Sequence, residues 1–175
     1  MERPKIIAIA ACSIDGFIAR ADDELISWSS KEDKRLFAEE TRKARVVIMG
    51  SRTFQTLPRP LDSRLNIILT SHTQDCTDIP GQLEFINLLP EQVAHELGRR
   101  NFQTAFVCGG ARTYTEFLKM QLLDELWLTV EPVIFGKGIA IFNETVYGVA
   151  NRLIDTRQLN RDTVHLRYQV LYGQH

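Results

Sequence analysis

Apolar runs of strand length alternate with helical segments from residue 5 to residue 132, and this alternation constrains the fold more than any other feature. The expected strands are residues 5–13, 44–50, 64–71, 102–110 and 122–132. The expected helices are residues 29–43, 51–57, 90–100 and 112–121. Strands joined through helices need crossover connections. The pattern therefore predicts an α/β fold with a mainly parallel central sheet and helices on both faces.

The C-terminal part follows a different pattern. Apolar residues alternate with polar ones from Val164 to Tyr172, and residues 152–159 precede them across the turn-forming Asn160-Arg161-Asp162. This arrangement predicts a closing antiparallel hairpin. Because the sequence contains no linker or repeat, we expect one domain over residues 1–175.

Composition excludes several classes of function. A formal net charge of -1 argues against a surface that holds a nucleic-acid backbone, and no apolar run reaches the roughly 20 residues that span a bilayer. The three cysteines and four histidines show no metal-ligand spacing, so no metal is expected. Free thiols and the short apolar start indicate a cytoplasmic protein.

Three expected strands end in turns that suit an anionic ligand. These turns are residues 49–53 (MGSRT), 69–72 (LTSH) and 108–112 (CGGAR). Ligands of open parallel sheets lie beyond the carboxyl ends of the strands, where backbone N–H groups at helix starts can hold phosphate oxygens. Each turn alone could be purely structural. Together they predict a cofactor with several phosphates, although neither GxGxxG nor GxxxxGK[ST] is present.

Two longer segments carry a family resemblance. The segment MGSRTFQTLPRPLDSRLNIILTS (49–71) resembles the dihydrofolate reductase family in its Met-Gly turn, Arg-Pro-Leu loop, downstream arginine and Asn-Ile strand. The segment VCGGARTYTEFL (107–118) is similar to the second glycine turn of that family. The resemblance extends from about Ile6 to Phe142. It implies a dihydrofolate reductase-like fold and a reductase that uses NADPH.

The resemblance also implies a cofactor site. Its residues would be Ala11, Ile18, Gly50, Ser51, Arg52, Thr53, Leu69, Thr70, Ser71, Cys108, Gly109, Gly110, Ala111, Arg112, Thr113 and Tyr114. Thr70 and Ser71 would lie near the adenosine 2'-phosphate. Family members often have a basic residue where Ser51 stands, so the preference for NADPH over NADH rests on Arg52 and the hydroxyls. Arg112 has an alternative reading as a surface helix residue.

The implied catalytic residues are Asp33, Trp28 and Thr129, and the implied substrate-binding residues are Ala10, Asp33, Phe37, Arg64 and Thr129. A carboxylate such as Asp33 can accept two N–H bonds from the 2-aminopyrimidinone edge of a pterin. Arg64 falls where the family binds the glutamate carboxylate of folate. Simpler readings remain for each group: helix capping for Asp33, core packing for the aromatic residues, and an exposed strand start for Arg64.

The leading function is therefore NADPH-dependent reduction of 7,8-dihydrofolate, with water admitted by the loop of residues 14–28 supplying the proton. A rival resemblance exists, because residues 122–144 are similar to the pyrimidine reductase domain of riboflavin biosynthesis, which acts on a ribosylamino-pyrimidine. A third alternative is an NADPH-binding protein of the same fold without turnover. The expected partner is a small pterin or pyrimidine, and the chain could be a monomer or a homodimer.

Overall fold

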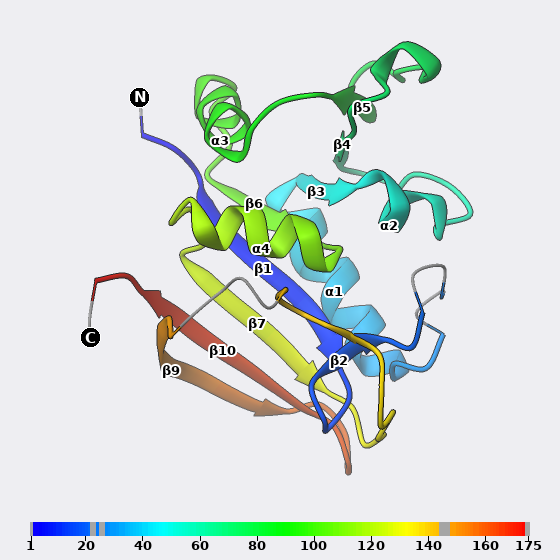
Figure 1. Ribbon diagram of the computed structural model, residues 1–175, viewed down its shortest axis with the longest axis vertical. Coiled ribbons are helices and arrows are strands. Elements are labelled where there is room, and N and C mark those ends of the chain that lie inside the picture. The colour runs from blue at the N-terminus through cyan, green and yellow to red at the C-terminus, as the bar shows by residue number, and fades with distance from the viewer. Residues whose placement is uncertain (1, 22–23, 25–26, 144–147, 174–175) are drawn as a thin grey trace.

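The computed structural model describes residues 2–21, 24, 27–143 and 148–173 (Figure 1). Its described residues form an eight-stranded sheet in the order β5-β4-β3-β6-β1-β7-β10-β9. The parallel strands are β1 (Lys5–Cys12), β3 (Val46–Gly50), β4 (Leu65–Leu69), β5 (Leu83–Ile86), β6 (Thr104–Val107) and β7 (Glu125–Val130). The antiparallel pair is β9 (Ala150–Gln158) and β10 (Val164–Leu171). The predicted fold class and C-terminal hairpin are confirmed.

Helices cover both faces of the parallel part of the sheet. The helices are α1 (Lys31–Ala44), α2 (Ser51–Gln55), α3 (Pro90–Arg99) and α4 (Ala111–Lys119). In Figure 1, α4 lies in front of the sheet and α1 behind it. Apolar residues of α3 and α4 share one core cluster, while those of α1 and α2 pack into the other. The parallel part of the sheet is therefore buried from both sides.

Strand β1 explains why the apolar runs are continuous rather than alternating. Ile6 and Ala8 belong to the cluster on the α3 and α4 face, whereas Ile7 and Ile9 belong to the cluster on the α1 face. A strand covered on both faces buries every side chain, so it carries no polar positions. All four residues are buried, as a central strand requires.

The structure adds elements that the sequence pattern did not predict. Strand β5 has only four residues and lies at the sheet edge. Strands β2 (Phe17–Ala19) and β8 (Ile139–Ala140) form a separate two-stranded sheet, and η1 (Thr73–Asp75) is a single 3-10 turn. Such short elements carry too few residues to show a period, so their position depends on long-range pairing. Within the described residues, no helix has the length and apolar character needed to cross a bilayer.

Docking of α4 on the sheet generates a stability prediction. Phe117 is fully buried in the core cluster beneath α4, whereas Met120, just beyond the helix, is 44% exposed. We expect Phe117→Leu to lower the free energy of unfolding by about 1–2 kcal/mol, because it removes buried volume that the core cannot refill. Met120→Leu should change it by less than about 0.5 kcal/mol. Urea unfolding measures both, and equal effects would contradict this packing.

Candidate active site

The carboxyl ends of the parallel strands open into a cavity of about 950 Å³. Most residues expected to bind cofactor or substrate line it. These are Ala10, Ala11, Ile18, Asp33, Phe37, Gly50, Ser51, Arg52, Thr53, Leu69, Thr70, Ser71, Cys108, Gly109, Gly110, Ala111, Arg112, Thr113 and Tyr114. Three expected site residues, Trp28, Arg64 and Thr129, are not part of the lining.

Two glycine turns, one after β3 and one after β6, meet at the wall of the cavity. The Gly50 N–H at the end of β3 donates to the Gly109 carbonyl oxygen after β6 at 2.9 Å. A Cβ atom at Gly50 would lie 3.0 Å from Thr113 Oγ1, and one at Gly110 would lie 3.2 Å from Thr53 Oγ1. Gly109 has a φ of 128°, a backbone angle that residues with side chains rarely adopt. The glycines thus allow the two turns to pack closely while leaving their backbone at the cavity surface.

The polar groups around these turns suit phosphate oxygens. Hydroxyl groups come from Ser51, Thr53, Thr70, Ser71 and Thr113, and guanidinium groups from Arg52 and Arg112. Helix α4 begins at Ala111, so its first N–H groups and dipole lie beside the second glycine turn. The donor set and the glycine cradle therefore fit the phosphates of a dinucleotide such as NADPH.

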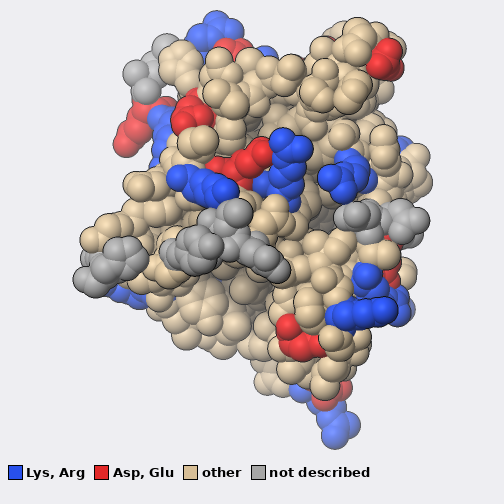
Figure 2. All heavy atoms as spheres, viewed as in Figure 1, with Lys and Arg blue, Asp and Glu red and all other residues tan. Residues whose placement is uncertain are grey.

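Arg112 forms an ion pair within its own helix. Arg112 Nε donates to Glu116 Oε1 at 2.8 Å, an ion pair that lies on the exposed side of α4. On the face seen in Figure 2, basic and acidic side chains are interspersed and form no continuous basic patch. An anion in this cavity would therefore contact individual arginines and backbone groups rather than a basic patch.

Asp33 lies in the first turn of α1, at the cavity wall, and the residue is 8% exposed. The N-cap of this helix is Ser30, whose hydroxyl accepts from the Asp33 N–H at 3.2 Å. The cap is therefore supplied by Ser30, and the Asp33 carboxylate is available to the cavity. Burial raises the pKa of Asp33 above its ordinary value, although the neighbouring hydroxyl groups of Thr129 and Ser29 oppose this effect.

A second buried carboxylate, Glu131, was not anticipated from the sequence. Its Oε1 accepts from the Ser30 N–H at 2.8 Å and from the Ser30 hydroxyl at 2.7 Å, and its Oε2 accepts from Thr163 Oγ1 at 2.9 Å. Glu131 thereby ties the start of α1 to the end of β7 and the start of β10. Its charge also contributes to the raised pKa of Asp33. In the sequence Glu131 lies inside the expected strand of residues 122–132, and no motif marked it.

Thr129 lies behind Asp33 in β7 and is 1% exposed. Its hydroxyl group lies close enough to Asp33 to lower the pKa of that carboxyl group. The same hydroxyl oxygen lies 3.1 Å from Nδ1 of His165, on the neighbouring strand β10. The structure thus brings Asp33 and Thr129 together. It also places His165 beside Thr129, a contact that no sequence pattern indicated.

The two aromatic residues expected at the site differ in position. Phe37, one helical turn after Asp33, lines the cavity. Trp28 instead packs edge-to-face against Phe135 with ring centroids 5.0 Å apart, and its Nε1 has no hydrogen-bond partner among the described residues. Tyr114 lines the cavity, but its hydroxyl donates to the Ile9 carbonyl oxygen at 2.7 Å and so also fixes α4 to β1.

The loop of residues 14–28 is attached to the segment after β7. The Asp15 carboxylate accepts from the Phe135 N–H at 3.1 Å and from the Gly136 N–H at 2.7 Å. Residues 22–23 and 25–26 of this loop lie outside the described residues, so its expected role in admitting water stays a prediction.

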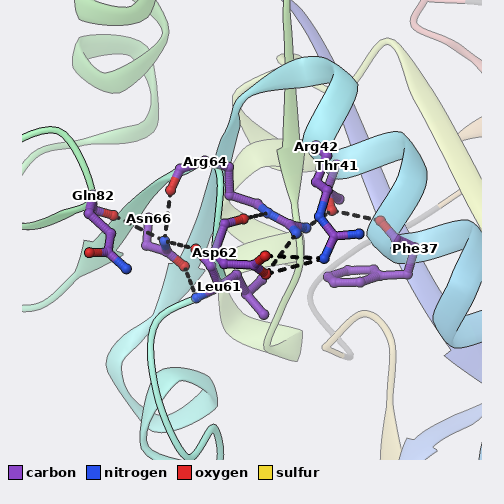
Figure 3. A network of polar contacts seen from close by, with 8 residues as sticks. All are labelled: Phe37, Thr41, Arg42, Leu61, Asp62, Arg64, Asn66 and Gln82. Atoms are coloured by element: carbon purple, nitrogen blue, oxygen red, sulfur yellow. Dashed lines mark hydrogen bonds and ion pairs between the residues drawn. The ribbon is translucent and has the colours of Figure 1, made fainter.

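Arg64 occupies a buried network beside the cavity rather than its wall (Figure 3). Its side chain is 2% exposed, its Nε donates to the Asp62 carbonyl oxygen at 2.8 Å, and a guanidinium nitrogen donates to Thr41 Oγ1. Burial lowers the pKa of Arg64. Asn66, also drawn in Figure 3, holds the same loop by bonding Leu61 in both directions. The alternative reading of Arg64 as an exposed arginine at the strand start is wrong, because its side chain is buried.

A family model and a curated relative agree on one family for this chain. The family model described as dihydrofolate reductase matches residues 5–163. The protein YwjB of Bacillus subtilis is 28% identical over 96% of this chain and 98% of its own length. Dihydrofolate reductase type 3 of Salmonella typhimurium is 32% identical, covering 71% of this chain and 70% of that protein.

Solved structures show the same fold. RibD of Acinetobacter baumannii superposes with a TM-score of 0.82 at 18% identity, covering 97% of this chain and 58% of that chain. A structure described as a putative riboflavin biosynthesis protein, from a Shewanella species, has a TM-score of 0.73 at 19% identity and covers 95% of this chain and 99% of that chain.

The buried position of Arg64 leads to a prediction about stability. Arg64→Met keeps the aliphatic stem but removes the donors to Asp62 and Thr41, so we expect the free energy of unfolding to fall by about 2 kcal/mol. Arg42→Met is the matched control, because Arg42 is exposed and contacts Asp62 at 3.3 Å. The control should lose less than about 0.5 kcal/mol. If urea unfolding gives equal losses, the buried network contributes no more than the surface pair.

Proposed function

Because the chain belongs to the dihydrofolate reductase family, we propose that it is an NADPH-dependent reductase of a ring with an amidine-like edge, with 7,8-dihydrofolate as the leading substrate. The observation that carries this proposal is Asp33. Its carboxylate lies at the wall of a cavity that two phosphate-suited glycine turns also line. A buried carboxylate that does not cap its helix, beside such turns, is typical of a site that orients a ligand.

The proposed cofactor site uses both glycine turns. Gly109, Gly110 and the first N–H groups of α4 would hold the pyrophosphate, while Arg52, Thr70 and Ser71 would face the 2'-phosphate. NADPH bound there supplies the hydride. The walls formed by β1 and β2, including Ala10, Ala11 and Ile18, would exclude water from the ring-binding end of the cavity.

Asp33 would bind and orient the ring rather than attack it. An ionised carboxylate accepts two N–H bonds from the amidine-like edge, and its negative charge favours protonation of the reacting ring nitrogen. Phe37, on the same face of α1, would pack against the ring. Among the described residues no three His, Cys, Asp or Glu side chains form a metal-binding group. The proposed catalysis thus depends on juxtaposition and electrostatics of this chain's own residues.

A ribosylamino-pyrimidine is the second candidate substrate, and Arg64 is the observation that favours it. Dihydrofolate carries a glutamate carboxylate that needs a cation, yet the Arg64 guanidinium is buried and engaged outside the cavity lining. A smaller pyrimidine would not need that arginine. The two solved structures described above, one named RibD and one named for riboflavin biosynthesis, are consistent with this alternative.

One experiment separates these functions. The loss of NADPH absorbance is followed with dihydrofolate and with the ribosylamino-pyrimidine in parallel, at equal protein concentration. Preferential turnover of dihydrofolate supports the leading proposal, and preferential turnover of the pyrimidine supports the second. Tight NADPH binding without turnover of either ring would replace both with a non-catalytic NADPH-binding protein.

The position of Asp33 predicts opposite effects of one substitution on stability and on activity. A raised acid pKa means that the folded state binds more protons than the unfolded state between the two pKa values, so ionised Asp33 lowers stability as pH rises through that window. Asp33→Asn should therefore keep or raise the free energy of unfolding at pH 7. The substitution should nevertheless lower kcat/KM at least about tenfold, because one charged acceptor is lost.

Glu32→Gln is the control for that substitution. Glu32 also lies in the first turn of α1, but it is exposed and outside the cavity lining. It should retain wild-type kcat/KM. An Asp33→Asn protein with wild-type turnover and reduced stability would instead assign this carboxylate to the helix alone.

The two arginines of the cofactor site should differ in their effect on cofactor choice. Arg52→Ala should reduce the preference for NADPH over NADH about tenfold or more, since a charge-assisted bond to the 2'-phosphate is lost. Arg112→Ala should weaken both cofactors by a similar factor, because both carry the pyrophosphate. Fluorescence titration with each cofactor measures these ratios. Equal affinity of the wild-type protein for NADPH and NADH would contradict the assignment of Arg52.

A further inference from the structure

His165 contacts Thr129, whose hydroxyl group is close enough to the proposed substrate-binding carboxylate of Asp33 to lower its pKa. In the antiparallel pairing of β7 with β10, His165 is opposite Thr129, so the two side chains share one face of the sheet. His165 is 2% exposed and Thr129 is 1% exposed, and Thr129 Oγ1 lies 3.1 Å from His165 Nδ1. The imidazole also packs edge-to-face on Trp127 with centroids 5.7 Å apart. The pair is therefore held in one geometry.

The hydroxyl group of Thr129 has a single hydrogen to donate. If that hydrogen points to His165, the Asp33 carboxylate faces only oxygen lone pairs of Thr129. If it points to Asp33, the nitrogen of His165 that contacts Thr129 must carry the donor hydrogen. A carboxylate beside a hydroxyl favours the second arrangement, since a hydrogen bond to the charged form stabilises it.

The other ring nitrogen supports the same tautomer. His165 Nε2 is buried and has no hydrogen-bond partner among the described residues. A buried N–H group without an acceptor is rarer in proteins than a buried acceptor without a donor. The uncharged ring with hydrogen on Nδ1 leaves only a lone pair at Nε2, and so satisfies both ends of the imidazole best.

Charged groups around His165 also keep the ring neutral. Arg157 is paired opposite it on β9, and Arg167 lies two residues along β10. Burial, assisted by these arginines, lowers the pKa of His165 to about 4, although Asp155 and Glu40 oppose the arginines. The nearby buried carboxylates are engaged elsewhere: Glu125 with Arg167 and Trp127, and Glu131 with Ser30 and Thr163.

We propose that His165 is a positioning residue: its Nδ1–H donates to Thr129 and thereby commits the Thr129 hydroxyl hydrogen to the Asp33 carboxylate. The chain of donors runs from β10 through β7 to α1. It keeps Asp33 ionised in a buried site, and its effect on turnover rests on the proposed function. No proton is transferred along the chain in this proposal, because each group keeps its own hydrogen.

Two variants of His165 separate positioning from packing. His165→Phe keeps a ring against Trp127 but removes the donor, whereas the amide nitrogen of His165→Asn branches from the same carbon as Nδ1 and can donate in its place. In the wild-type protein, ¹⁵N spectra should show His165 as the Nδ1–H tautomer. The ¹³C titration of Asp33 should move to higher pH in His165→Phe and return toward the wild-type position in His165→Asn.

An Nε2–H tautomer in the wild type, or an Asp33 titration that His165→Phe leaves unmoved, would overturn the proposal. These spectra need neither NADPH nor a substrate, so they decide it even if the proposed function fails. Absence of turnover with both rings in the wild-type protein would overturn the function alone.

Where the wild type is active, kinetics give a second test. His165→Phe should lower kcat/KM about threefold more on the acid limb of the pH profile than on the plateau, because protonation of Asp33 becomes easier. In a Thr129→Val background, which lacks the connecting hydroxyl, the same substitution should produce no additional shift of that limb. A uniform loss at every pH, or full additivity of the two substitutions, would assign His165 to packing only.

Discussion

Burial of the parallel strands between two apolar layers is the constraint on which the rest of this structure depends. Because α3 and α4 cover one face and α1 the other, the interiors of the central strands β1, β3 and β6 carry only apolar side chains. In these three strands the polar side chains, Lys5 and Thr104, stand at the strand starts. The carboxyl ends of the parallel strands lie at one edge, which is where the cavity and its donors occur.

The close contact of the two glycine turns is a direct consequence of this sheet. Strands β3 and β6 are neighbours, so the turns that follow them meet, and the Gly50 N–H reaches the Gly109 carbonyl oxygen. A side chain at Gly50 would press against Thr113, and one at Gly110 against Thr53. The glycines thus allow the turns to pack closely. They also leave backbone groups at the cavity surface, where these groups suit phosphate oxygens.

Polar groups that the fold buries at a cost gather at Asp33, a residue of the cavity wall, and behind it. Asp33, Glu131, Thr129 and His165 are all nearly inaccessible, and their hydrogen bonds join α1, β7 and β10. Burial of a carboxylate with a raised pKa lowers stability at neutral pH. The buried charge therefore lowers the stability of the fold at this position. Such local destabilisation is common where a protein needs a specific charged group for its function.

The sequence by itself determined the order of the main strands and helices, the parallel sheet and the glycine turns, because these depend on local periodicity and on residues with special backbone freedom. It also singled out Asp33 through a resemblance. Only the tertiary structure decided that Ser30 caps α1, that Arg64 is buried, and that His165 lies against Thr129. These facts depend on pairing between residues far apart in the chain. Strand register and burial fix such contacts, and no local pattern records them.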